Sequence, residues 1–453
     1  MQTAVTKPDQ HLMTQGKITR QLILFCIPLL LGNLFQLLYN TVDSIVVGNY
    51  IGSLALAAVG AATPVINLFV SFFVGLSAGA GVIVARRYGA QDVDGTQKAV
   101  HTFLTFAMGV GLVLSVTGVV LTAQILRWIG VPENVFSQAE IYLAIYFAGN
   151  VFVTVYNAGT GILQAVGDAK HPLYFLAAAS GINIVLDLWF VGGLGMGVGG
   201  AALATVLSQA ASAALVTVQL TRAQGSYRLH WRALRIHPNV LREILRYGIP
   251  AGVQQTIVSL SNVVVQSYVN TFGASAIAGY SSANKYDNFL LLPVNSFGLA
   301  AATFTGQNLG ARQFDRVRRG VRTALALSIG TVSVLGLIVY CQADFCISLF
   351  SQERDVIAAG ASLIRIMCPF YSILCFHQVF TGALRACGRS YIPMFTAILS
   401  FVVYRQIFLA LILPHHHVIE MIGWGFSSSW VLGALLTGGY YFASHWLQRE
   451  AET

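Results

Sequence analysis

The sequence predicts an all-α membrane protein with twelve transmembrane helices in two six-helix lobes that are parallel repeats of each other. Three observations lead to this prediction: the composition, the number of long apolar segments and an internal similarity. Hydrophobic residues make up 56% of the 453 residues and charged residues only 9%, against about 25% charged residues in a typical soluble domain. So few charges cannot cover the surface of a soluble protein of this size, which excludes soluble and nucleic-acid-binding classes and leaves lipid as the main solvent.

Twelve apolar segments follow a polar N-terminal stretch. Each is long enough to cross a hydrocarbon core of about 30 Å as a helix, in some cases with tilt. In chain order the predicted spans cover residues 22–48, 54–84, 100–126, 136–165, 173–192, 198–221, 243–270, 276–306, 320–343, 356–384, 392–413 and 420–446.

The positions of lysine and arginine predict the orientation of these spans. Of the 26 basic residues, 21 fall on the same side as the N-terminus, and only Arg127 and Arg354 fall on the opposite side. Lys285, Arg365 and Arg405 lie within spans. Because cytoplasmic loops carry the excess of basic residues, we expect both termini in the cytoplasm of a multi-pass protein of the inner or plasma membrane.

The chain resembles itself at an offset of about 221 residues. Gly161–Gly167 aligns with Gly382–Gly388, and Pro28 aligns with Pro250. Each half holds an even number of spans, so both halves enter the membrane in the same sense. The predicted organisation is a cytoplasmic segment over 1–21, an N-lobe over 22–221, a basic linker over 222–242, a C-lobe over 243–446 and a cytoplasmic tail over 447–453.

Two facing six-helix lobes predict a transporter, because rocking such lobes opens the cavity between them to either side in turn. A helical scaffold for a membrane-embedded enzyme is the alternative. A prenyl or phospholipid transferase would need a DxxxD-type pair of acids for a magnesium-bound diphosphate. Asn183 and Asp187 provide the single near match, and half of it is an amide.

Acidic residues inside the spans are the first candidates for a functional site. Asp43 and Asp187 lie deep in predicted spans, where an ionised carboxylate costs about 2.5–3.5 kcal/mol. Asn183 precedes Asp187 by one helical turn, so both side chains share a face and offer oxygens to a sodium ion or a site for a proton. The alternative is that neighbouring hydroxyls and amides merely satisfy these acids. Pro28 removes a backbone hydrogen bond from the same span as Asp43, which predicts a hinge.

The second half does not repeat these acids. Instead it places Asp287 in a span, and we expect this carboxylate either to pair across helices with Arg405 or Arg365 or to contact substrate. The candidate residues for a substrate cavity are Tyr39, Asn40, Tyr156, Lys285, Asp287 and Arg405.

Other motifs are missing from the sequence. It contains no GxxxxGK[ST] phosphate loop and no GxSxG or HExxH motif, so we expect no use of ATP by the chain itself, no enzymatic activity, and energy from an ion gradient or a partner. Six cysteines lie in or beside apolar stretches without a CxxC pair, and we expect them to be buried and to bind no metal.

Several motifs together resemble those of the multidrug and toxic compound extrusion (MATE) transporters, over about residues 18–446. The matching motifs are Ile27-Pro28, Asp43–Gly48, Leu54–Val59, Gly161–Gly167 with its copy Gly382–Gly388, and Gly195–Gly200. The resemblance implies a monomer that exports amphipathic, cationic drugs or toxic compounds in exchange for protons or sodium, without a cofactor. The wider superfamily includes flippases of lipid-linked precursors, and a flippase is therefore the alternative function.

The resemblance also implies a coupling site. In the prokaryotic, DinF-like branch of the family, an N-lobe cation site uses an aspartate of the first helix, an asparagine and aspartate of the fifth, and a threonine of the sixth. Asp43, Asn183, Asp187 and Thr205 occupy those positions. NorM-type members carry a glutamate in the seventh helix and an aspartate in the tenth. Here Gln254 stands near the first of these positions and the tenth span has no acid, which favours coupling through the N-lobe.

Overall fold

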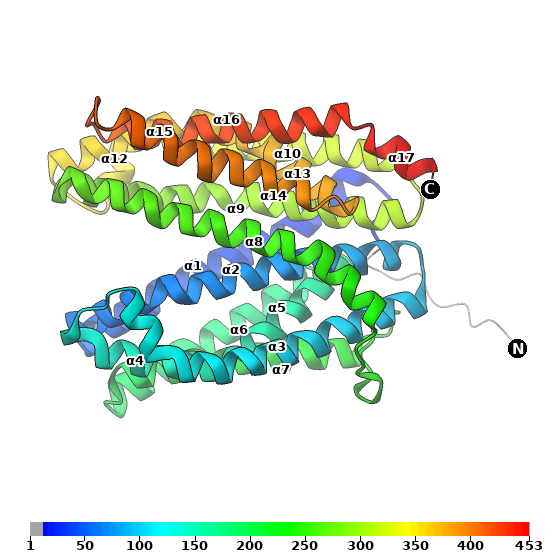
Figure 1. Ribbon diagram of the computed structural model, residues 1–453, viewed down its shortest axis with the longest axis horizontal. Coiled ribbons are helices and arrows are strands. Elements are labelled where there is room, and N and C mark those ends of the chain that lie inside the picture. The colour runs from blue at the N-terminus through cyan, green and yellow to red at the C-terminus, as the bar shows by residue number, and fades with distance from the viewer. Residues whose placement is uncertain (1–11, 453) are drawn as a thin grey trace, which may run out of the picture. The chain divides into compact units, whose positions relative to one another are not determined.

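The computed structural model describes residues 12–452, apart from the side chains at positions 38–40, 44, 45, 53, 449, 451 and 452. Within that range the chain is helical and has no β-strand (Figure 1). The all-α prediction is confirmed.

The first half of the chain forms seven α-helices and one π-helix. They are α1 (Ile18–Tyr50), α2 (Ser53–Gly89), α3 (Val93–Trp128), α4 (Glu133–Ala148), α5 (Asn150–Ala165), α6 (Lys170–Asp187), the π-helix η1 (Leu188–Gly193) and α7 (Gly197–Arg222). A connection with the short 3-10 helix η2 (Trp231–Ala233) leads into the second half.

The second half forms more interrupted helices. They are α8 (Pro238–Val269), η3 (Asn270–Phe272), α9 (Ala274–Gly310), α10 (Phe314–Cys341), α11 (Ala343–Ser348), α12 (Arg354–Met367), η4 (Cys368–Phe370), α13 (Tyr371–Ala386), α14 (Tyr391–Ala397), the π-helix η5 (Ile398–Tyr404), α15 (Arg405–Ile412), α16 (Glu420–Ala443) and α17 (Trp446–Glu452).

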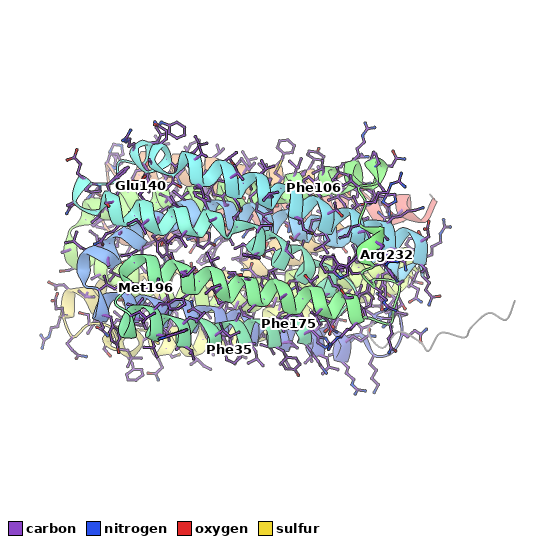
Figure 2. All side chains as sticks on the ribbon, turned by 90° about the horizontal axis from the view of Figure 1, so that it is seen from below. Phe35, Phe106, Glu140, Phe175, Met196 and Arg232 are labelled. Carbon is purple, nitrogen blue, oxygen red and sulfur yellow. The ribbon has the colours of Figure 1, made fainter. Side chains whose placement is uncertain are left out.

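Each of the twelve predicted spans coincides with one helix or one broken helix. By length and apolar composition, nine helices of the described chain can each cross a membrane, and α4 with α5, bent by 48° at Gly149, makes a tenth. The two remaining predicted spans are α8 and α16. In the first half, Arg232 lies at one end of the bundle and Glu140 and Met196 lie toward the other (Figure 2).

Helix boundaries repeat between the two halves. The helices that begin at Ser53, Val93, Glu133, Asn150 and Lys170 have counterparts that begin at Ala274, Phe314, Arg354, Tyr371 and Tyr391, each 221 positions later. The fifth span of each half also contains a π-helical segment, η1 or η5. The repeat predicted from short sequence matches is therefore a repeat of whole helices.

The repeated glycine motif has a physical explanation. A Cβ at Gly161 would come within 3.2 Å of Ser77 on α2, and a Cβ at Gly382 would overlap the carbonyl oxygen of Gly298 on α9. These glycines let two helices cross closely, as small residues do in membrane bundles. The glycines that end the motif, Gly167 and Gly388, have φ angles of 94° and 78°, a left-handed conformation that glycine adopts without steric cost.

The chain divides into two compact units. One comprises Ile27–Arg246, and the other comprises Met13–Cys26 together with the residues from Tyr247 onward. Within the second unit, α9 and α10 hold the N-terminal segment: Met13 N donates to Gln307 Oε1 (2.7 Å) and Arg316 donates to Gln21 Oε1 (2.8 Å). The division therefore falls inside α1, one residue before Pro28.

Candidate functional site

Asn183 and Asp187 form a fully buried polar pair in the first unit. Both lie on α6, one turn apart, and both side chains are 0% exposed. Neither the amide nor the carboxylate of this pair has a hydrogen-bond partner among the described residues. Asp187 is the last residue of α6 and directly precedes the π-helix η1, and π-helical turns occur frequently at functional sites.

Asp43, on α1, reaches the same place. Its carboxyl group lies within hydrogen-bonding reach of that of Asp187. Two carboxylates can only accept, so Asp43 Oδ1 and both carboxylate oxygens of Asp187 have no donor in the described part of the chain. Two adjacent carboxylates in a low-dielectric site repel each other unless a proton or a cation lies between them. The arrangement therefore suits a proton or a small cation.

Thr205 lies on α7, which packs against α6. Its side chain is 6% exposed, and its hydroxyl donates to the carbonyl oxygen of Ala201 (3.1 Å), so its lone pairs stay available to a cation. Thr41, one possible donor to Asp43, donates to Leu37 O instead (2.8 Å). Local hydroxyls of the described residues therefore do not satisfy these acids.

The other candidates of the first half are less informative. Tyr156 is half-buried on α5. The side chains of Tyr39 and Asn40 lie outside the described residues. Pro28 lies inside α1, which stays helical on both sides of it.

Asp287 and Arg365 of the second unit have partners that the sequence did not predict. Asp287 accepts a hydrogen bond from the hydroxyl of Tyr371, and Arg365 pairs with Asp344. No salt bridge joins Asp287 to Arg365 or Arg405 among the described residues, but the charge of Arg405 acts on Asp287. Cross-helix pairing with Arg405 and contact with substrate both stay predictions. Because Tyr371 begins α13 beside α9, an uncharged donor reaches the carboxylate before either arginine.

Arg405 is 2% exposed and has neutral partners. Its guanidinium donates to Ser429 Oγ (3.1 and 3.2 Å) and to Asn262 Oδ1 (3.0 Å), and its carbon Cζ lies 4.2 Å from the ring centroid of Phe426. Asp287 and Tyr280 lie within electrostatic range. Lys285, in contrast, is exposed, with Nζ 5.5 Å from the ring of Phe350.

One polar contact was not foreseen from the sequence. Gln254, which stands near the position of the glutamate of NorM-type members, is 5% exposed and accepts a hydrogen bond from Arg385 Nη2 (2.7 Å). Arg385 is one of the 21 basic residues that the sequence places on the cytoplasmic side, and a contact with Gln254 was not predicted for it. The second unit thus holds a glutamine-arginine contact at this place.

A comparison with known protein families decides which family this chain represents. The MatE family model matches twice, over residues 28–189 and 250–411. The chain belongs to the MatE family. Both matches begin at a proline, so the family's own repeat follows the repeat seen in the helices.

Curated relatives cover nearly the whole chain. It is 32% identical over 447 residues to the probable multidrug resistance protein YoeA of Bacillus subtilis (strain 168), covering 96% of each chain. It is 29% identical to the probable multidrug resistance protein YpnP of the same organism, covering 96% of this chain and 97% of YpnP. The multidrug export protein MepA of Staphylococcus aureus is 22% identical, with 83% of each chain covered.

Solved structures share the fold. An outward-facing multidrug resistance MATE family transporter of the MOP superfamily superimposes with a TM-score of 0.91 at 24% identity, covering 99% of this chain and 100% of that one. A MOP superfamily transporter from Pyrococcus furiosus gives 0.90 at 23% identity, with the same coverage. The twelve-helix, two-lobe prediction is confirmed, and this MatE-family chain is a multi-pass membrane transporter and not an enzyme.

Proposed function

We propose that this MatE-family chain exports amphipathic, cationic organic compounds across the cell membrane in exchange for inward protons or sodium. The neighbouring acids Asp43 and Asp187 carry the proposal. Asp187 is 0% exposed and Asp43 is half-buried, and no described donor reaches Asp43 Oδ1 or either carboxylate oxygen of Asp187. Curated relatives named for multidrug resistance or export support the substrate class.

The proposed mechanism depends on whether an ion occupies the site of Asp43 and Asp187. A proton or sodium ion bound by Asp43 and Asp187, with Asn183 and Thr205 as neutral ligands, offsets the repulsion between the two carboxylates. Loss of that ion restores the repulsion and favours a different position of α1. Pro28 would let α1 bend between the two states. A gradient that fills the site from one side only then drives alternating access.

The remaining parts of the proposal concern the setting of the transporter. We place both termini in the cytoplasm, because 21 of the 26 basic residues fall on that side. We propose a monomer, with no ATP and no cofactor, whose partners are small organic molecules and membrane lipid. In the second unit, Tyr280, Asp287 and Arg405 are candidates to line the substrate path.

The test is dye efflux by proteoliposomes under an imposed proton or sodium gradient, comparing the parent with Asp187→Asn. We expect gradient-driven efflux of a cationic dye by the parent and a loss of at least tenfold in the variant, because the neutral amide can neither bind a proton nor balance a cation. Asp94→Asn is the matched control, since Asp94 is an exposed carboxylate that pairs with Lys98 at the start of α3. It should transport like the parent.

Different failures have different meanings. Full efflux by the Asp187→Asn variant would remove the coupling site but leave export standing. No efflux by the parent under either gradient would overturn the export proposal and favour a flippase for lipid-linked precursors. The same assay with a fluorescent lipid-linked substrate would then be the next experiment.

A further inference from the structure

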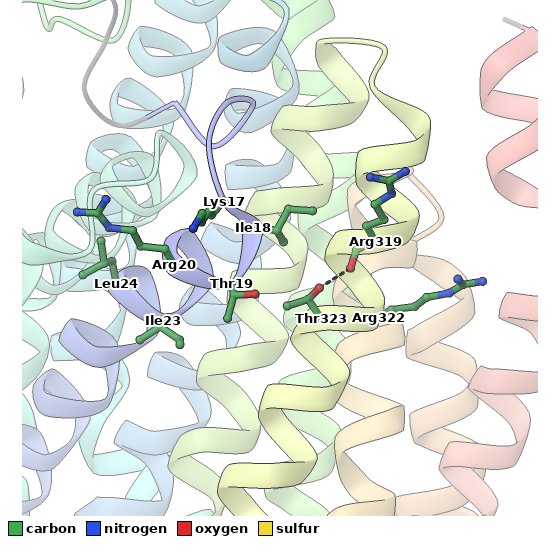
Figure 3. Close-up of a pocket in the computed structure, with 9 residues that line it drawn as sticks. All are labelled: Lys17, Ile18, Thr19, Arg20, Ile23, Leu24, Arg319, Arg322 and Thr323. Carbon is green, nitrogen blue, oxygen red and sulfur yellow. Dashed lines mark hydrogen bonds between the residues drawn. The ribbon is translucent and has the colours of Figure 1, made fainter.

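A cavity of about 810 Å³ opens on the second unit where the start of α1 lies beside the second turn of α10 (Figure 3). All of its lining residues belong to the second unit, whereas Asp43 and Asp187 belong to the first. Its lining residues are Lys17, Ile18, Thr19, Arg20, Ile23 and Leu24 on the α1 side and Arg319, Arg322 and Thr323 on α10.

The rim of this cavity carries four positive charges and no negative one. Lys17, Arg20, Arg319 and Arg322 are all exposed, and no ion pair joins any of them to a carboxylate within residues 12–452. The charges come in two pairs at spacing i, i+3: Lys17 and Arg20 at the start of α1, and Arg319 and Arg322 on α10. On α10 this spacing puts both arginines on one face, where they repel each other. Basic side chains that line one cavity and have no salt bridge among the described residues are stabilised when an anion binds near them.

The polarity of the cavity changes within one helical turn. Lys17 directly precedes α1 and Arg20 lies in its first turn, and Ile23 and Leu24 follow with exposed fractions of 37% and 50%. At 1.5 Å per residue, the basic and apolar parts are separated by about 6 Å along the helix. A free phosphate ion would use the basic rim alone, whereas a lipid with a charged headgroup and an acyl chain matches both parts.

We propose that this cavity binds one anionic phospholipid of the cytoplasmic leaflet. Its phosphate lies at the basic rim formed by Lys17, Arg20, Arg319 and Arg322, and an acyl chain lies along Ile23 and Leu24. The basic side of the membrane is where such lipids meet pockets of lysine and arginine between helices. The bound lipid joins the first turn of α1 to α10, and therefore stabilises the part of α1 that precedes Pro28.

Native mass spectrometry of the purified full chain tests this proposal, with phosphatidylglycerol and phosphatidylcholine of identical acyl chains as probes. We expect at least one phosphatidylglycerol to be retained in preference to phosphatidylcholine. Arg319→Gln combined with Arg322→Gln should weaken that binding about 30-fold, since each basic side chain near an anionic surface contributes about 1 kcal/mol and 1.4 kcal/mol corresponds to tenfold. Lys17→Gln combined with Arg20→Gln should act in the same direction.

The matched control removes the same charge elsewhere. Arg232→Gln combined with Arg235→Gln alters two exposed arginines of the first unit and should leave retention of phosphatidylglycerol unchanged. Equal loss in this control would overturn the proposal, because it would show binding by overall charge. Equal retention by the Arg319 and Arg322 double variant and by the parent would also overturn it.

A third arm separates a lipid from a free anion. Leu24→Ser should weaken retention of phosphatidylglycerol, since it removes apolar contact with the acyl chain. Inorganic phosphate at millimolar concentration should not displace the lipid. Displacement by phosphate together with an unchanged Leu24→Ser variant would overturn the lipid in favour of a simple anion site. Because no gradient is applied, the result is independent of whether the chain exports drugs.

Discussion

Individual buried charges have different partners in the two units. In the first unit, the carboxyl groups of Asp43 and Asp187 face each other without a described donor. In the second unit, Asp287 has Tyr371 and Arg405 has Ser429 and Asn262. A satisfied charge is suited to holding structure, and an unsatisfied pair is suited to changing occupancy. This difference agrees with coupling in the first unit only.

The contacts of Arg405 with Ser429, Asn262 and Phe426 predict that it also stabilises the fold. Arg405→Lys keeps the charge but loses the planar guanidinium, which donates to two helices and stacks on Phe426. We expect a loss of about 2 kcal/mol in stability, measured by thermal unfolding in detergent. Arg365→Lys, at an exposed arginine paired with Asp344, should cost less than about 1 kcal/mol. Equal effects of the two substitutions would contradict the role given to Arg405.

At the scale of helices, the repeated glycines make a second prediction. Gly382→Ala would force a Cβ into the carbonyl oxygen of Gly298, whereas the closest atoms to a Cβ at Gly161 lie 3.2 Å away. We expect Gly382→Ala to destabilise the protein by about 3 kcal/mol and Gly161→Ala by about 1 kcal/mol. Gly330→Ala on α10 is the control, because a Cβ there has nothing within 4 Å. Thermal unfolding of the three variants measures the order, and a reversed order would refute the crossing geometry.

The proline in α1 gives a third prediction. Pro28→Ala restores the backbone donor that proline lacks and removes the clash with the preceding turn. We expect unchanged or higher thermal stability together with at least tenfold slower dye efflux, because α1 would no longer bend readily. Pro250→Ala, in the matching position of α8, is the control. It should slow efflux less, since α8 carries no acid corresponding to Asp43. Normal efflux by the Pro28→Ala variant would show that α1 needs no hinge.

At the scale of the whole molecule, the sequence predicts which segments form helices better than it predicts which side chains meet. Composition and the offset of 221 residues were enough for the number of spans and the repeat, because both depend on patterns along one chain. The contact of Asp287 with Tyr371 and that of Gln254 with Arg385 depend on how helices rotate against each other. Hydropathy carries no information on that rotation. The hydrogen bond between Met13 and Gln307, 294 positions apart, is equally invisible to local patterns.

The exposure of one cysteine gives a test of the orientation of the chain in the membrane. The sequence predicted all six as buried, but Cys341 is exposed at the end of α10, while the other five are buried. If the N-terminus is cytoplasmic, the ninth span runs outward and Cys341 lies at the external surface. We therefore expect a membrane-impermeant maleimide to label intact cells, and Cys341→Ser to abolish the labelling. Labelling confined to inside-out vesicles would reverse the topology, and with it the cytoplasmic position of the lipid cavity beside α1.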